Sequence, residues 1–119
     1  MDKSDSFYES LKFKMDKYAH RVYSLTKGFP KEEIYGVTSQ LRRASLSVAL
    51  NFVEGYARRR KAVALNFFEI SYGSLKESVY LLDFSFHEGY INSKEKDECA
   101  LIADNIGAML WGIIKKLEK

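Results

Sequence analysis

Residues 30–61 read PKEEIYGVTSQLRRASLSVALNFVEGYARRRK. Pro30 suits a first helical turn, where its missing N–H costs nothing, and Gly28 is placed to end a preceding helix. Apolar residues then recur at spacings of three and four, which is the helical period. The stretch therefore predicts a helix over residues 31–55, with Gly36 inside it. Its first apolar stripe consists of Ile34, Val37, Leu41, Ala44, Val48 and Phe52.

The same helix carries a second apolar stripe. A helix with two apolar faces needs two surfaces to pack against. We therefore expect one stripe to lie inside its own bundle and the other to face a second copy of the chain. The second stripe consists of Tyr35, Leu46, Leu50, Val53 and Ala57. A polar strip between the two consists of Gln40, Arg43, Ser47, Asn51 and Glu54.

The rest of the chain repeats the helical period. No segment alternates as a strand does, and a single Pro argues against the many tight turns of an all-β fold. The sequence predicts an all-α protein, an antiparallel up-down-up-down four-helix bundle, with residues 1–119 forming one domain. The three further helices are expected at residues 6–27, 62–89 and 93–118.

Two features mark the connection before the last helix. Gly89 is placed to stop the third helix, and Asn92 followed by Glu95 has the spacing of a capping box. Cys99 lies on the apolar stripe of the last helix, so we expect a buried structural thiol.

Composition narrows the class of protein. The chain has 119 residues, of which 46% are hydrophobic and 29% charged, enough for one bundle core. Cys99 is the only cysteine, so no disulfide framework is available. The polar N-terminus has no signal-peptide core, and no apolar run approaches the roughly 18 residues of a membrane span. We expect a soluble, cytoplasmic protein with no membrane partner.

Charge is segregated along the chain. Residues 31–61 carry seven basic and three acidic side chains, whereas residues 62–105 carry three basic and eight acidic ones. Such segregation suits either an anionic partner or self-association through opposite patches.

The sequence contains no familiar catalytic or cofactor motif. A di-metal bundle site needs Glu-x-x-His, but Lys17 and Phe84 precede the two histidines by three residues. The Arg-x(4–6)-His pattern of bundle-type ribonucleases and the glycine-rich phosphate loops are also missing. Glu54 is either a catalytic acid or part of an Arg–Glu network at a packing face, and the network is the commoner arrangement. The sequence thus predicts no enzyme, no metal and no cofactor.

Three motifs carry a family resemblance: FPKEE at residues 29–33, YGVTSQLRRA at 35–44 and NFVEGYARR at 51–59. With them the chain resembles the bacterial four-helix bundle proteins of the S23 type, encoded in intervening sequences of large-subunit ribosomal RNA. That family includes the accessory variability determinant of diversity-generating retroelements. The resemblance implies a ring-like homopentamer with a basic surface. In the retroelement branch it also implies binding to nucleic acid and to a reverse transcriptase.

Two positions depart from the family pattern. Ala49 stands where the family usually has Pro, so a milder kink is expected in the second helix. Arg60 stands where the family often has Ser, which removes a natural N-cap and adds charge to the loop.

The basic residues of the central stretch are the candidate site. Guanidinium groups donate to phosphate in bidentate fashion and stack on bases, so with Tyr56 they suit a phosphate-binding surface for RNA or DNA. The alternative is a purely structural homo-oligomer in which these arginines pair with the acidic helices of a neighbour. The candidate residues are Arg42, Arg43, Arg58, Arg59, Arg60 and Lys61.

Overall fold

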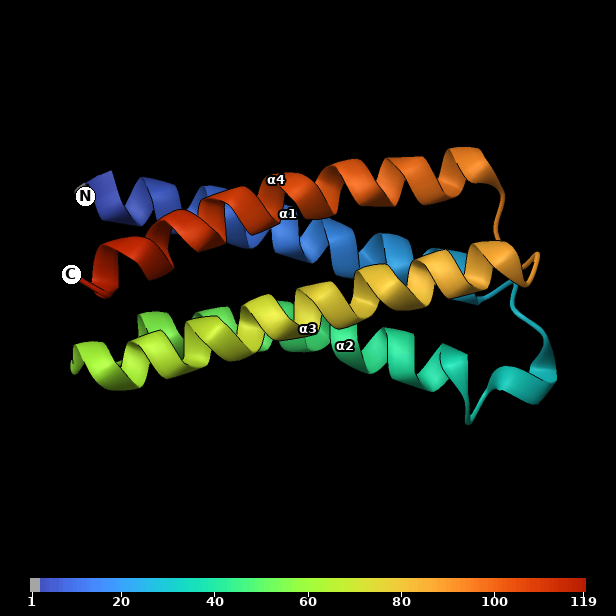
Figure 1. The fold of residues 1–119 in the computed structure, drawn as a ribbon, viewed down its shortest axis with the longest axis horizontal. Coiled ribbons are helices and arrows are strands. Elements are labelled where there is room, and N and C mark those ends of the chain that lie inside the picture. The colour runs from blue at the N-terminus through green and yellow to red at the C-terminus, as the bar shows by residue number, and fades with distance from the viewer. Residues whose placement is uncertain (1–2) are drawn as a thin grey trace.

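The computed structural model describes residues 3–119, which form four long helices and one short 3-10 helix. Successive long helices run in opposite directions, so that the N-terminus, the C-terminus and the α2–α3 connection meet at one end (Figure 1). No strand occurs within residues 3–119. The predicted antiparallel four-helix bundle is confirmed. The elements are α1 Lys3–Thr26, η1 Lys31–Glu33, α2 Val37–Tyr56, α3 Lys61–His87 and α4 Ser93–Leu117.

The core lies along the axis of the bundle, and all four long helices contribute to it. Tyr18, Phe52, Leu75 and Ile106 come one from each helix and are essentially inaccessible to solvent. The Tyr18 hydroxyl is paired with the Ser78 hydroxyl at 2.7 Å, which satisfies both polar groups inside an apolar environment. Burial of its side chain raises the pKa of Tyr18.

The predicted start of the second helix is wrong. Residues 31–33 form η1, and α2 begins only at Val37, with Gly36 as its N-cap rather than an interior residue. Gly36 has φ −112° and ψ −120°, outside the helical region. The Val37 amide donates to Glu33 Oε1 at 3.2 Å, so a carboxylate satisfies a helix N-terminus that backbone bonds leave open.

Glu33 is itself held by a distant residue. The Tyr90 hydroxyl, between α3 and α4, donates to Glu33 Oε2 at 2.8 Å. This hydrogen bond raises the pKa of Tyr90 to about 12. The α1–α2 connection is thereby fixed against the α3–α4 connection.

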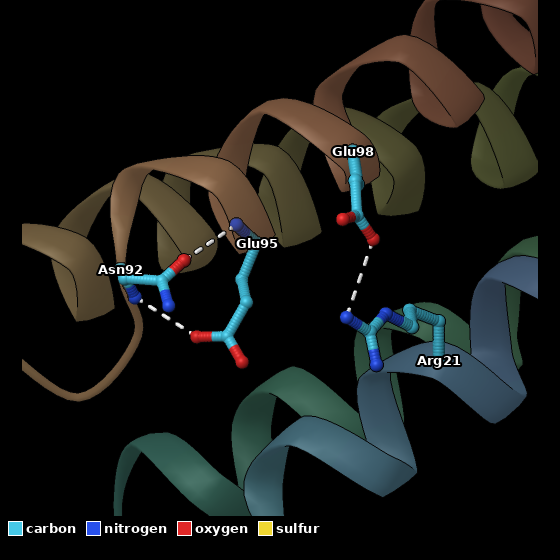
Figure 2. A network of polar contacts seen from close by, with 4 residues as sticks. All are labelled: Arg21, Asn92, Glu95 and Glu98. Carbon is cyan, nitrogen blue, oxygen red and sulfur yellow. Dashed lines mark hydrogen bonds and ion pairs between the residues drawn. The ribbon is translucent and has the colours of Figure 1, made fainter.

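The α3–α4 connection has the predicted signals. Gly89 adopts φ +83°, the left-handed conformation that glycine tolerates at a helix end. The Glu95 amide donates to Asn92 Oδ1 at 2.8 Å and the Asn92 amide donates to Glu95 Oε1 at 2.9 Å, which confirms the capping box (Figure 2). One turn later, Arg21 of α1 pairs with Glu98 of α4 at 3.3 Å (Figure 2).

Candidate nucleic-acid interface

The six candidate basic residues fall into two separate groups. Arg42 and Arg43 lie in the first half of α2, and the other four lie at or after its end. Sixteen residues separate Arg42 from Arg58, which is about 24 Å of helix at 1.5 Å per residue. The six therefore do not form one continuous surface.

The Arg42 side chain packs within the bundle. Its Nε donates to Thr26 Oγ1 at 2.7 Å, and its guanidinium lies 4.7 Å from the centre of the Tyr23 ring. Both partners belong to α1, so Arg42 fastens α2 to α1. Arg43, one residue on, is exposed.

The second group surrounds the connection between α2 and α3. Arg58 is bound to Glu54, one turn earlier, and its guanidinium lies 5.1 Å from the centre of the Phe67 ring. Arg59, Arg60 and Lys61 are exposed. Arg60 is the N-cap of α3 and makes no side-chain capping bond, as expected where Arg replaces Ser.

A fifth cation joins this group from another helix. Lys116, in the last turn of α4, lines the same pocket as Arg58, Arg59 and Lys61. Sequence reasoning missed it, although the up-down topology brings the end of α4 to the α2–α3 connection (Figure 1). Within residues 6–119, none of Arg59, Arg60, Lys61 and Lys116 has an ion-pair partner.

The pocket at this end of the bundle, here called the terminal pocket, has a volume of about 660 Å³. Most of its lining is apolar and aromatic, while Arg58, Arg59, Lys61 and Lys116 form its charged part. The apolar and aromatic lining consists of Phe7, Tyr56, Ala64, Phe68, Ile113 and Leu117. Tyr56 is held by a tilted stack on Tyr8, with ring centroids 4.1 Å apart.

Of the five members of the polar strip of α2, one is bonded to α3 and a second is bonded to that member. The Ser47 hydroxyl is paired with Ser74 of α3 at 2.8 Å, and Asn51 Nδ2 donates to Ser47 Oγ at 2.8 Å. Beside them, the Ser71 hydroxyl of α3 donates to the Val48 carbonyl at 2.7 Å. Small hydroxyl side chains thus let α2 and α3 approach closely. In the rest of the strip, Gln40 and Arg43 are exposed, and Glu54 is also exposed while paired with Arg58.

The second apolar stripe of α2 remains uncovered in the single chain. We call Leu46, Leu50 and Val53 the outer stripe; they are 40%, 61% and 36% exposed. On α3, Val63 and Ile70 are exposed as well. By contrast, the first stripe is buried from Val37 to Phe52, and only Ile34, which precedes α2, is open to solvent.

Other candidate chemistry can be placed in the same bundle. Cys99 is fully buried, and that burial raises the pKa of its thiol to about 11, as expected of a structural cysteine. Among the side chains of residues 6–119, no three potential metal ligands come together. Across the described part of the chain, none of the helices has the length and apolar character needed to cross a membrane.

Comparison with known proteins agrees with the resemblance seen in the motifs. No curated protein matches the chain. A crystal structure of a protein of unknown function from the S23 ribosomal protein family of Bacteroides thetaiotaomicron is similar in fold, with a TM-score of 0.82 at 23% identity. The match covers 88% of this chain and 98% of that one. The model of the 23S rRNA-intervening sequence protein family matches residues 11–112, and the chain therefore belongs to that family.

Proposed function

We propose that this protein is a non-enzymatic, self-associating scaffold that binds nucleic acid through the end of the bundle where α2 meets α3. The observation that carries the proposal is the group of four cations there, Arg59, Arg60, Lys61 and Lys116. Three come from one short stretch and the fourth from α4, and within residues 6–119 none is neutralised by an acid. Phosphate oxygens are the ligands that such unpaired cations favour.

Self-association would bring several copies of this basic surface into one assembly. The outer stripe supports assembly, because a contiguous apolar face is a typical interface feature. Each copy in a closed ring repeats the basic end, so the phosphates neutralised add up across subunits. Five subunits, and a reverse transcriptase as a protein partner, are what the resemblance implies. The proposed nucleic acid is RNA or DNA. We also propose a cytoplasmic location for the protein.

The test is a variant in which Arg58, Arg59, Arg60 and Lys61 are all replaced by Gln. The affinity should fall by the same factor for every nucleic-acid sequence, because contacts to phosphate do not depend on the base sequence. For duplex DNA, the slope of log affinity against log salt should flatten by about 0.9 for each phosphate that is no longer neutralised. Since Arg58 is bound to Glu54, we expect the flattening to correspond to about three phosphates, rather than four. Arg43→Gln is the matched control, being exposed and remote from the loop.

The second candidate is a purely structural homo-oligomer, and the outer stripe is the observation that favours it. In that case the loop arginines pair with acidic residues of α3 and α4 in a neighbour. The quadruple variant would then dissociate, and the wild type would not bind nucleic acid at physiological salt. Size-exclusion chromatography beside the salt-titrated binding assay separates the two. An intact oligomer with unchanged binding would refute the choice of loop.

A further inference from the structure

The terminal pocket combines two kinds of lining that have different consequences for a ligand. Its floor is built from side chains with no hydrogen-bonding group. Its polar part consists of the Tyr56 hydroxyl and four cations, Arg58, Arg59, Lys61 and Lys116. A volume of about 660 Å³ lies in the range of pockets that hold small molecules. The apolar floor residues are Phe7, Ala64, Phe68, Ile113 and Leu117.

The shape of the floor is set by close packing at Gly55. A Cβ built there would come within 2.6 Å of the Phe68 ring, so glycine allows that ring to lie against α2. Ile113 and Leu117 are one turn apart on α4 and only partly buried. They therefore offer apolar surface that the single chain does not use.

The charges on the lining favour a ligand of negative charge. Arg58 already pairs with Glu54, which leaves Arg59, Lys61 and Lys116 without an acidic partner within residues 6–119. A ligand that covers the floor therefore gains affinity if it brings an anionic group to these cations. These three cations are exposed and hydrated, so an anionic head group gains by pairing with them, whereas a cationic head group is repelled.

The lining also argues against an inserted nucleic-acid base. The edge of a base carries hydrogen-bond donors as well as acceptors, and the Tyr56 hydroxyl is the only side-chain acceptor among the lining residues. Burying donors without partners costs free energy. An alkyl chain has no donors that need a partner, and each methylene that it buries adds favourable binding free energy.

We propose that the terminal pocket binds a linear anionic amphiphile of the fatty-acid class. The alkyl chain lies on Phe7, Ile113 and Leu117, and the carboxylate meets Arg59 and Lys116. This site goes beyond nucleic-acid binding and does not depend on it. The two ligands share Arg59 and Lys116, so a bound acyl anion competes with phosphate at the same end of the bundle.

Isothermal titration calorimetry with octanoate, decanoate and dodecanoate, each below its micelle concentration, tests the proposal on the full chain. We expect saturable binding, with affinity rising about fourfold for each methylene until the floor is filled. Decyltrimethylammonium should not bind, because it has the same chain with the opposite charge.

Lys116→Gln and Lys115→Gln form a matched pair. Both remove one positive charge from the last turn of α4, but Lys115 pairs with Glu118 and lies over the Trp111 ring, outside the pocket. Lys116→Gln and Arg59→Gln should each weaken decanoate binding roughly 2- to 10-fold, which corresponds to the removal of one hydrogen bond. Lys115→Gln should leave it unchanged. Leu117→Gln should reduce the increase in affinity that each added methylene of the ligand produces.

Three results would overturn the proposal: no saturable binding of decanoate, equal effects of the two lysine substitutions, or equal binding of the cationic amphiphile. Preferential binding of a mononucleotide, with the same contrast between Lys116 and Lys115, would reassign the pocket to a base and also overturn it. The nucleic-acid proposal is judged separately by the salt slope of the loop variant. Either one can therefore fail without the other.

Discussion

Leu50 is the most exposed member of the outer stripe, with 61% of its surface open to solvent. Fully burying a leucine contributes about 1.5–3 kcal/mol, so covering the exposed part contributes about 1–2 kcal/mol per interface. A carboxylate at this position adds a further cost, because it must lose its hydration when a neighbour covers it. We expect Leu50→Glu to raise the dissociation constant of the assembly at least about tenfold.

The fold of the single chain should hardly be affected by this change. Leu50 lies on the side of α2 away from the core, and substitutions at exposed positions usually change stability by less than about 0.5 kcal/mol. Leu101→Glu is the matched control, since Leu101 is 73% exposed but lies on α4. It introduces the same charge on another face of the bundle.

Light scattering after size exclusion, over a dilution series, measures the effect. The wild type and Leu101→Glu should remain assembled at concentrations where Leu50→Glu has dissociated. Urea denaturation of the dissociated variant checks that the bundle is intact. A wild type that runs as a 13.8 kDa monomer at micromolar concentration would refute the reasoning. So would a Leu50→Glu variant that assembles as tightly as the control.

Three further predictions concern the bundle itself. Leu41→Ala and Leu110→Ala should each lower the free energy of unfolding by about 2–5 kcal/mol, because both side chains are fully buried. A decrease below about 1 kcal/mol at either site in chemical denaturation would contradict this packing. Asn92→Ala should cost about 0.5–2 kcal/mol by removing the N-cap of α4, and an unchanged urea midpoint would count against the cap. Tyr90 has its pKa raised to about 12, so the folded chain keeps a proton that the unfolded chain loses near pH 10. Stability should therefore fall as pH rises from about 10 to 12, and Tyr90→Phe should make that fall shallower in pH-dependent denaturation.

The helices could be predicted because each has one dominant core stripe with the helical period. Leu41, Val48 and Phe52 are all buried, as their spacing requires. The capping box at Asn92 could also be predicted, since both of its partners lie within three residues.

The start of α2 could not be predicted in the same way. Glu33 bonds the Val37 amide while accepting from Tyr90, which is 57 residues further along the chain. A tertiary contact thus contributes to where the helix begins, and local propensity carries no information about it. The periodic pattern continues through Ile34, which explains why it predicts a helix that begins too early.

The candidate site was harder to predict than the fold, and Arg42 shows why. In the sequence it resembles Arg59: both are arginines beside another arginine in a basic stretch. Only the packing of α2 on α1 gives Arg42 the Thr26 hydroxyl as a partner, while Arg59 faces the terminal pocket. The chemical identity of a residue therefore indicates what it can bind, and tertiary packing decides whether it is available.

This difference leads to a prediction that separates the two arginines. Arg42→Gln should lower the free energy of unfolding by about 0.5–1.5 kcal/mol, the usual contribution of one such hydrogen bond, and leave the salt dependence of nucleic-acid binding unchanged. Arg59→Gln should do the opposite: stability stays the same, and the salt slope flattens by about one unit. Urea denaturation and salt-titrated binding, run on both variants, give the comparison. If Arg42→Gln flattened the salt slope as much as Arg59→Gln does, the division of the basic residues into two groups would be wrong.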